Sequence, residues 1–331
     1  MKITHLAKAF SEGKIEKKFF WQLMREKFAL LLDYKELIAD NSVCDAIIID
    51  KEGAILVFGS NGKGGGIKIR FDFSETISRA EAILSMKGDY EQEDFDFLVA
   101  NIKSGDVIFD VGGNVGLFSL ILAYACPNTT IYSFEPIPVT YEKLEKNLDL
   151  NKSLKKNIQT FNIGFSSEQG TFDFFLPGTN QAASMKPIND EFYLMESDSK
   201  GNYTGKEKLV KIECKVDTID LFCNNHSISK IDILKLDIEG AERDALTGAK
   251  GTLNKFLPLV YCEMLRKHAA RFGYHPNEII DYMNEKGYDC FAFHHHKFIT
   301  FQKMDESTLE TNFFFLHRDK HSGIINKYLE V

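Results

Sequence analysis

The sequence has few of the residues that hold small metal-bound or disulfide-linked domains together. Six cysteines occur in 331 residues, and no two of them form a C-x-x-C pair. Structural zinc sites and dense disulfide frameworks depend on closely spaced cysteines, so we expect neither. Several cysteines stand in apolar runs such as AYAC and VYCEM, where a thiol packs as a small hydrophobic group. Free thiols are typical of a reducing compartment, and the predicted location is the cytoplasm.

The chain also lacks an excess of basic residues and a long apolar segment. Its 40 Lys and Arg side chains are outnumbered by 48 Asp and Glu, which gives a formal net charge of −8. Nucleic acids and anionic membrane surfaces attract basic proteins, so we expect neither as a main partner. The longest apolar run, Val115–Cys126, is too short to span a bilayer, and the N-terminus has no apolar signal core.

The apolar residues that are present predict two regions of different organisation. Residues 1–87 read as an N-terminal extension, with an amphipathic helix within 14–39 and β-hairpins after it. From 88 to 331 strands alternate with helices, which predicts an α/β fold with a doubly wound, mostly parallel sheet. The last two strands have no helix between them, so we expect an antiparallel end. Residues 164–217 interrupt this rhythm and are interpreted as an insertion of hairpin strands and a polar loop.

The stretch VIFDVGGNVG, at 107–116, predicts a strand, a tight turn and a helix that together bind a ligand. A dinucleotide fingerprint requires G-x-G-x-x-G, and Val111 stands where its first glycine should be. A carboxylate at the end of the strand repels a phosphate and attracts a cation. The residues predicted to hold the ligand at this turn are Asp110, Gly112, Gly113, Asn114 and Gly116.

A second acid follows the next predicted strand, in the sequence SFEP. Glu135 and Pro136 stand there, and a carboxylate at this point of an α/β sheet can accept hydrogen bonds from both hydroxyls of a ribose. The two positions together favour a ligand with a ribose and positive charge. S-adenosylmethionine has both.

Four stretches of the chain resemble the FkbM-type S-adenosylmethionine-dependent methyltransferases. They are DVGGNVGLFSL, SFEPIPVTYEKLEKNLDLN, IDILKLDIEGAERDALTGA and VYCEM, and the resemblance covers about residues 88–317. It implies a Rossmann-like class I methyltransferase fold and O-methylation of a hydroxyl, often on a sugar or natural product. The implied partner is a small-molecule or glycan acceptor. One departure is Gly113, where the family usually has alanine, and we expect it to loosen the turn.

The motif KLDIEGAE supplies the candidate catalytic residues. A sugar hydroxyl is a poor nucleophile until a base takes its proton. Asp237 and Glu239 rank first as that base because they follow a buried strand, and Glu263 and His268 are further candidates. Glu242 is expected to interact with a helix N-terminus. Two acids can also hold a divalent cation, but no third ligand stands at a suitable spacing, so no metal site is predicted.

Three features leave alternatives open. His294, His295 and His296 are adjacent, and because successive strand residues point to opposite faces, we expect a strand end or turn rather than a metal site. A nicotinamide-dependent oxidoreductase is the second enzyme class, and a non-catalytic binding protein on a methyltransferase fold is the third reading. The N-terminal amphipathic helix can pack on the main domain or serve a homodimer.

Overall fold

The computed structural model describes residues 3–26, 44–58, 66–71, 91–176, 183–187, 195–197, 203–206 and 209–329. Helix α1 (Ile3–Ser11) is followed by a second helical segment at 17–26, and the rings of Phe10 and Phe20 stack between them at 4.4 Å. This second segment is the described part of the amphipathic helix predicted within 14–39. The remainder of that prediction lies outside the described residues.

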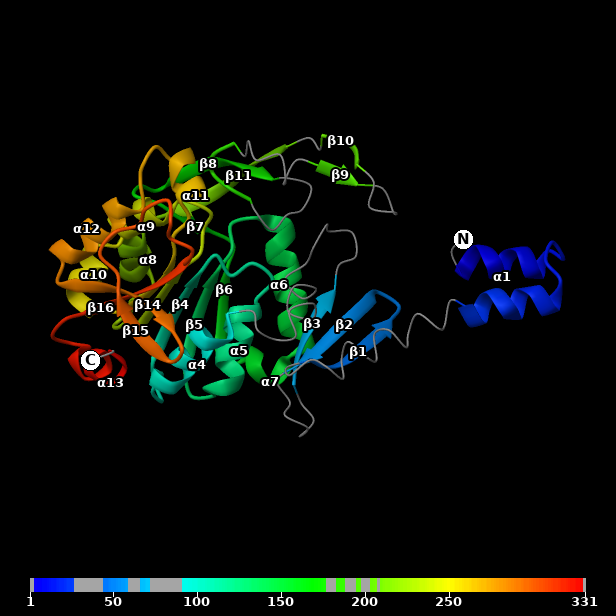
Figure 1. Cartoon of the computed structure of the whole chain (residues 1–331), viewed down its shortest axis with the longest axis horizontal. Helices are drawn as coiled ribbons and strands as arrows, with labels where there is room; N and C mark the ends of the chain where they lie inside the picture. Colours follow the sequence, from blue (N-terminus) through cyan, green and yellow to red (C-terminus); the bar gives the residue numbers. More distant parts are fainter. Residues whose placement is uncertain are drawn as a thin grey trace.

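A mixed sheet forms the centre of the main domain (Figure 1). Its eight described strands lie in the order β15-β14-β16-β13-β12-β4-β5-β6. In that order their bounds are Lys297–Thr300, Tyr288–His294, Asn312–His317, Leu259–Glu263, Ile233–Leu236, Val107–Val111, Thr130–Phe134 and Ile158–Phe161. The five strands from β13 to β6 are parallel, while β16 is antiparallel to both of its neighbours. The predicted doubly wound sheet with an antiparallel end is therefore confirmed.

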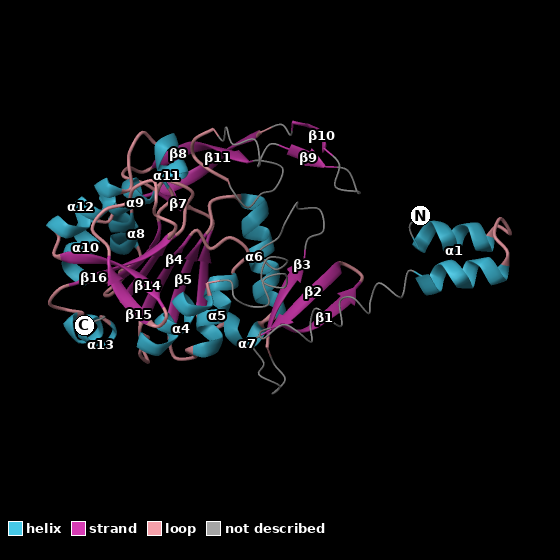
Figure 2. Cartoon of the chain, in the orientation of Figure 1, coloured by secondary structure: helices cyan, strands magenta, loops and turns pink. Residues whose placement is uncertain are grey.

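Helices cover both faces of this sheet (Figure 2). Side chains of α4 (Gln92–Asn101), α5 (Leu117–Ala125) and α6 (Pro138–Leu150) pack on one face in a cluster with Ile108. The next residue, Phe109, belongs to a second cluster with α8 (Ile219–Asn225), α9 (Glu242–Thr247), α10 (Lys250–Phe256), α11 (Arg266–Arg271) and α12 (Asn277–Glu285). A strand buried on both faces carries apolar side chains at successive positions, which explains the apolar run Val107–Phe109 in β4.

The apolar pattern of residues 241–253 predicts one helix behind the strand that ends in KLD, but the structure has two helices there, α9 and α10. The chain turns between α9 and α10 at Gly248, where an added Cβ would lie 2.2 Å from the carbonyl oxygen of Ser166. A glycine at this point lets the two backbones come into contact. The break thus arises from a contact between distant parts of the chain.

The topology places a crevice between β4 and β12. The chain runs from β4 through β5 to β6 on one side, and then returns to add β12 and β13 on the other side. Ligands of open α/β sheets bind at this kind of switch point, outside the carboxyl ends of the strands. Both predicted acidic motifs follow these strand ends.

A small antiparallel sheet of the N-terminal extension docks on the main domain. It consists of β1 (Cys44–Asp50), β2 (Gly53–Phe58) and β3 (Ile67–Phe71). The side chain of Asn151 accepts a hydrogen bond from the backbone N–H of Lys68 at 2.9 Å and donates one to its carbonyl at 2.7 Å. Asn147 of α6 accepts from the N–H of Arg70 and donates to the carbonyl of Val115 at 2.8 Å. These asparagines replace the missing neighbour of β3.

The insertion forms a second small sheet, in the order β7-β11-β8. Its strands are β7 (Gly164–Phe165), β8 (Gly170–Leu176) and β11 (Val210–Asp217), and a separate pair joins β9 (Met195–Ser197) to β10 (Tyr203–Lys206). Phe174 and Leu176 pack against Ile137, which follows β5. The insertion therefore lies over the carboxyl edge of the central sheet.

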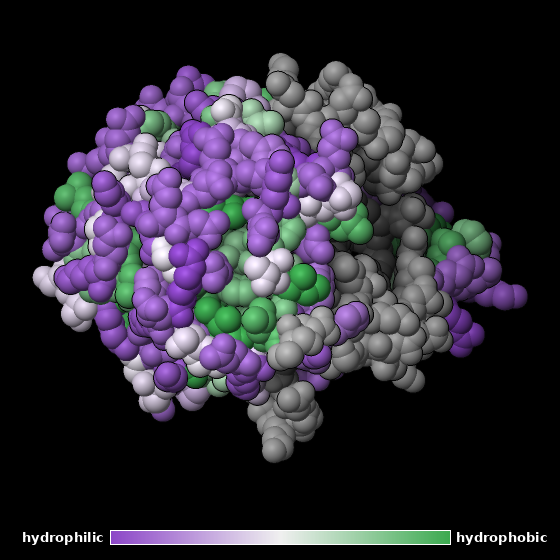
Figure 3. Space-filling model, turned by 60° about the vertical axis from the view of Figure 1, so that its left-hand side comes forward, coloured by the Kyte–Doolittle hydropathy of each residue, from purple (hydrophilic) through white to green (hydrophobic). Residues whose placement is uncertain are grey.

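The surface of the main domain is mostly polar on the face drawn in Figure 3, and apolar residues occupy a smaller area at its centre. None of the helices in the described ranges has the length and apolar character needed to cross a membrane. The last described helix, α13 (Ser322–Tyr328), packs through Ile325 and Tyr328 on the face that carries α4.

We predict that Asn151→Ala weakens the docking of the N-terminal sheet. The substitution leaves the N–H and C=O of Lys68 without their partner, which costs about 1–3 kcal/mol. Urea unfolding should show this loss, and hydrogen exchange should show faster exchange of the Lys68 amide. Asn225→Ala, at an exposed helix end, is the matched control. An unchanged Lys68 exchange rate in Asn151→Ala would contradict the docking role.

Candidate functional site

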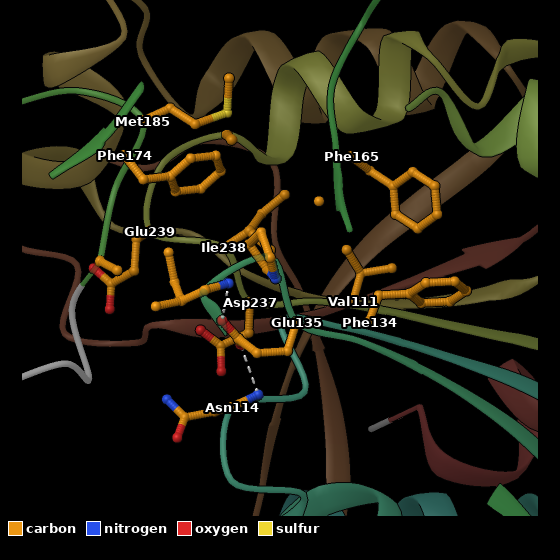
Figure 4. Close-up of a pocket in the computed structure, with 16 residues that line it drawn as sticks. Val111, Asn114, Phe134, Glu135, Phe165, Phe174, Met185, Asp237, Ile238 and Glu239 are labelled. Atoms are coloured by element: carbon orange, nitrogen blue, oxygen red, sulfur yellow. Dashed lines mark hydrogen bonds between the residues drawn. The ribbon is translucent and has the colours of Figure 1, made fainter. Parts of the chain in front are cut away.

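One pocket lies at the predicted switch point, and its walls come from four parts of the chain (Figure 4). These parts are the turn after β4, the segment after β5, the turn after β12 and the insertion. The lining residues are Val111, Gly112, Asn114, Phe134, Glu135, Pro136, Ile137, Gly164, Phe165, Phe174, Ala183, Met185, Asp237, Ile238, Glu239 and Ala241. Three carboxylates line this pocket, and no lysine or arginine does so among the described residues. The pocket is therefore suited to a ligand with positive charge.

The glycine turn brings the ends of β4 and β12 into contact. Gly112 has φ 84°, and an added Cβ there would lie 1.9 Å from the carbonyl oxygen of Asp237. Asn114 also has a positive φ, 49°, and Gly116 precedes α5 with φ 86°. Gly112 and Asn114 line the pocket, whereas Gly113 and Gly116 face Ser133 and Leu144 behind the turn.

Asp110 lies beneath the turn and does not line the pocket. Its side chain is fully buried, and it accepts hydrogen bonds from Ser119 at 2.7 Å and Ser133 at 3.3 Å. Its other oxygen lies 3.0 Å from the ammonium nitrogen of Lys235. The cation that the sequence led us to expect beside Asp110 is thus a buried lysine of the chain itself.

Lys235 joins the two acidic motifs. Its ammonium donates a hydrogen bond to the Gly112 carbonyl at 2.9 Å and lies 3.5 Å from Oδ2 of Asp237. It also lies 5.3 Å from the ring centre of Phe118. Sequence reasoning gave this residue no role, although a lysine inside the apolar run IDILKLD is a signal that it has a buried partner.

Glu135 holds the backbone of the pocket from the end of β5. One oxygen accepts from the N–H of Asn114 at 3.0 Å, and the other accepts from the N–H of Ile137 at 2.9 Å. Burial raises the pKa of Glu135 to about 7, although these two hydrogen bonds act in the opposite direction. Glu135 and Pro136 both line the pocket, as expected for a ligand-binding pair.

Glu242 holds the turn after β12 through backbone N–H groups, as Glu135 does for the segments after β4 and β5. A single oxygen, Oε1, accepts from the N–H groups of Ile238 and Gly240 at 3.0 and 3.1 Å. Oε2 accepts from the hydroxyl of Tyr274 at 3.3 Å. Burial raises the pKa of Glu242 to about 7. The residue begins α9, so its predicted place at a helix N-terminus is confirmed, and it also shapes the turn.

Glu239 lies in this turn with a left-handed backbone conformation. Its φ is 58°, and its carbonyl accepts a hydrogen bond from the hydroxyl of Ser184 at 3.2 Å. Its carboxylate lines the pocket and lies 3.2 Å from Nδ1 of the buried His268. Residues other than glycine keep such a conformation only where the surroundings impose it, and they cluster at functional sites.

The other candidate catalytic acids have different positions. Asp237 lines the pocket, while Glu263 ends β13 and is not among the lining residues. His294 ends β14, and His295 and His296 form the turn to β15 with φ 50° and 61°. The expected turn is therefore confirmed. No group of metal-binding side chains was found in the ranges that the structure describes.

Comparison with known proteins gives consistent similarities. The family model for the methyltransferase FkbM domain matches residues 110–290. Methyltransferase sdnD of Sordaria araneosa is 30% identical over 185 residues, which cover 52% of this chain and 70% of sdnD. The 31-O-demethyl-FK506 methyltransferase FkbM of Streptomyces tacrolimicus is 27% identical, over 45% of this chain and 61% of that protein. The hexuronic acid methyltransferase AglP of Haloferax volcanii is 24% identical, over 54% and 64%.

The matches cover only part of the length of each relative. The chain spans less than two thirds of the length of FkbM and of AglP. The matched part nevertheless includes the glycine turn, the Glu135 segment and the turn after β12. Residues before 110 lie outside the family model.

We predict that Glu242→Gln stabilises the protein at pH 8 and has little effect at pH 5. The folded-state pKa is near 7 and the unfolded value is 4.5, so stability falls as the pH rises from about 5 to 7 and then levels off. A glutamine keeps both backbone hydrogen bonds through its single oxygen and carries no charge. We expect a gain of about 1–2 kcal/mol at pH 8, measured by urea unfolding at both pH values.

Glu135→Gln is the internal control for this prediction. Its two oxygens accept from different N–H groups, so the amide must lose one of these bonds. We expect no net stabilisation at pH 8, because the lost bond offsets the removal of the charge. Equal gains in both variants would show that the arrangement of hydrogen bonds is irrelevant.

We predict that Gly113→Ala destabilises the turn after β4. The family usually has alanine at this position, and from the sequence we expected the glycine to loosen the turn. The new Cβ would lie 2.2 Å from the hydroxyl of Ser133, so we expect a cost of about 1–3 kcal/mol. The double variant with Ser133→Ala should recover most of that loss in thermal unfolding. Gly323→Ala, where an added Cβ meets nothing within 4 Å, is the control. A double variant as unstable as Gly113→Ala alone would rule out this contact as the cause.

Proposed function

The chain belongs to the FkbM methyltransferase family and uses S-adenosylmethionine as its methyl donor, and we propose that it methylates a hydroxyl group of a sugar, a glycan or a small natural product. Its α/β fold is the Rossmann-like methyltransferase fold expected from the sequence. The observation that carries the proposal is that one pocket contains Glu135, the acid expected to bind a ribose, together with the two acids after β12, Asp237 and Glu239.

The residues of the pocket fit the donor. Glu135 can accept from two ribose hydroxyls, because each carboxylate oxygen keeps a lone pair beyond its backbone bond. Ile137 and Phe165 give apolar walls for a purine base beside it. The backbone of the turn after β4 allows close approach, and the acids offset positive charge. When bound, S-adenosylmethionine supplies an electrophilic methyl group on a sulfonium.

Glu239 is the residue best placed to take the proton of an acceptor hydroxyl. It lines the pocket, its backbone is fixed by the Ser184 hydrogen bond, and His268 lies against its carboxylate. A positioned base of this kind contributes about 10²–10⁴-fold to a rate. Asp237 also faces the pocket, whereas Glu263, outside the lining, is the weakest of the three predicted acids.

In this proposal the insertion contacts the acceptor and determines which acceptor is bound. Phe174 and Met185 enter the pocket from it, opposite the donor-binding turn (Figure 4). Relatives are named for different acceptors: 31-O-demethyl-FK506 for one and hexuronic acid for another. Loops that line a pocket on a rigid scaffold commonly set specificity, so an insertion opposite the donor-binding turn is suited to contact the acceptor. The six free cysteines fit the proposed cytoplasmic location.

The two alternatives explain the pocket less well. A nicotinamide dinucleotide carries a pyrophosphate, and the described lining offers three carboxylates and no basic side chain to it. A non-catalytic protein has no use for a left-handed Glu239 held at two points, by Ser184 and by His268. Turnover of the donor with a hydroxylated acceptor separates this last reading from the proposal.

We predict transfer of label from methyl-labelled donor to an oxygen of a hydroxylated acceptor. The panel consists of methyl glycosides, free uronic acids and macrocyclic alcohols, with amines and thiols of matched size as controls. Glu239→Gln should lower kcat by about 10²–10⁴-fold and leave the affinity for S-adenosylhomocysteine unchanged. Glu168→Gln, an exposed acid of the insertion, should behave like the native chain.

Two results would refute the proposal. One is label that moves to amines or thiols and never to a hydroxyl. The other is full activity of Glu239→Gln on the accepted hydroxyl. Product mass and the position of the new methyl group, read by NMR, decide between these outcomes.

A further inference from the structure

We infer that Asp237 is the residue that recognises the positive charge by which the methyl donor differs from its demethylated product, and that Lys235 fixes Asp237 in this role. The inference rests on the proposed function only in its choice of donor. It divides the two acids after β12 between the two substrates, with Asp237 on the donor side and Glu239 on the acceptor side.

The first step is the charge balance beneath the pocket. Lys235 lies 3.0 Å from a carboxylate oxygen of Asp110 and 3.5 Å from one of Asp237, and its side chain is only 3% exposed. Two carboxylates and one ammonium leave one net negative charge in this trio. A buried ammonium this close to both acids attracts each of them electrostatically.

The second step is which of the two acids meets the ligand. The side chain of Asp110 is 0% exposed, and it accepts hydrogen bonds from Ser119 and Ser133. The side chain of Asp237 is 15% exposed and lines the pocket. Of the two acids, only Asp237 faces the pocket. A ligand therefore meets the excess negative charge at Asp237 and not at Asp110.

The third step is the position of Asp237 between the two halves of the site. Its backbone N–H donates to the Val111 carbonyl at 3.2 Å, and its own carbonyl lies against Gly112 of the donor turn. Glu239, two residues later, is turned to His268 and the insertion. Asp237 thus belongs to the wall of the donor turn.

The fourth step is the chemistry that such a carboxylate distinguishes. S-adenosylmethionine carries a sulfonium, and S-adenosylhomocysteine has a neutral thioether at the same place. Their remaining groups are identical. A carboxylate near that position in the pocket discriminates between them by charge. Asp237 therefore favours the donor over the spent product.

The test uses two ligands that need no acceptor. Sinefungin has a protonated amine on carbon in place of the methylated sulfur, so it keeps the positive charge, and S-adenosylhomocysteine lacks it. Calorimetric titration gives both Kd values for the native chain and for Asp237→Asn. We expect Asp237→Asn to lower the ratio Kd(S-adenosylhomocysteine)/Kd(sinefungin) by about ten-fold. Glu168→Gln makes the same change in charge at an exposed residue outside the pocket lining, and it should leave the ratio unchanged.

A second variant keeps the test decisive if Asp237→Asn does not fold. Asp237→Ser removes the same carboxylate and leaves the pairing of Lys235 with Asp110 in place. The ratio should again fall by about ten-fold. A ratio within two-fold of the native value in either variant, or an equal loss of both ligands in Asp237→Asn, overturns the inference.

The outcomes also separate this inference from the proposed function. Both ligands bind whether the acceptor is a sugar, a glycan or another hydroxyl compound, so a wrong acceptor class leaves the ratio unaffected. Failure of the native chain to bind either ligand refutes the donor site itself. An altered ratio together with transfer to a non-hydroxyl acceptor supports the role of Asp237 and refutes only O-methylation.

Discussion

The site depends on one buried charge, the ammonium of Lys235. It lies in β12 between the carboxylates of Asp110 and Asp237, and it donates to the carbonyl of Gly112. An unpaired ammonium at this depth would be very costly, so the three partners must stay in place. Because they belong to adjacent strands on either side of the switch point, the pairing fixes the crevice that forms the proposed site.

Around this trio the chain uses carboxyl groups as supports for its loops. Glu135 holds the turn after β4, and Glu242 holds the turn after β12, each through two backbone N–H groups. Both acids have raised pKa values because they are buried. The resulting loss of stability at neutral pH is the kind that proteins keep where geometry matters for function. Glu239, in its left-handed conformation, is held differently, by the Ser184 hydroxyl at its carbonyl and by His268 at its carboxylate.

The sequence anticipated much of this, because its signals are local. Alternation of apolar strands and helices gave the parallel sheet, and the position of Glu135 after a strand placed it in the pocket. The prediction for Asp110 was incomplete: the residue lies behind the pocket, and its cation is Lys235. His268 was among the candidate bases, but its pairing with Glu239 joins residues on α11 and on a turn, and no spacing reveals such a contact.

The sequence by itself determined the order of elements, the glycine turn, the acids at the strand ends and the family, since periodicity, backbone freedom and motif order are properties of neighbouring residues. Only the tertiary structure decided which acid faces the ligand and which is neutralised. It also decided that the 241–253 helix breaks where Gly248 meets Ser166, and that β3 is held by asparagines of another element. Burial and charge pairing arise when distant segments meet, and the free energy of each carboxylate is set there.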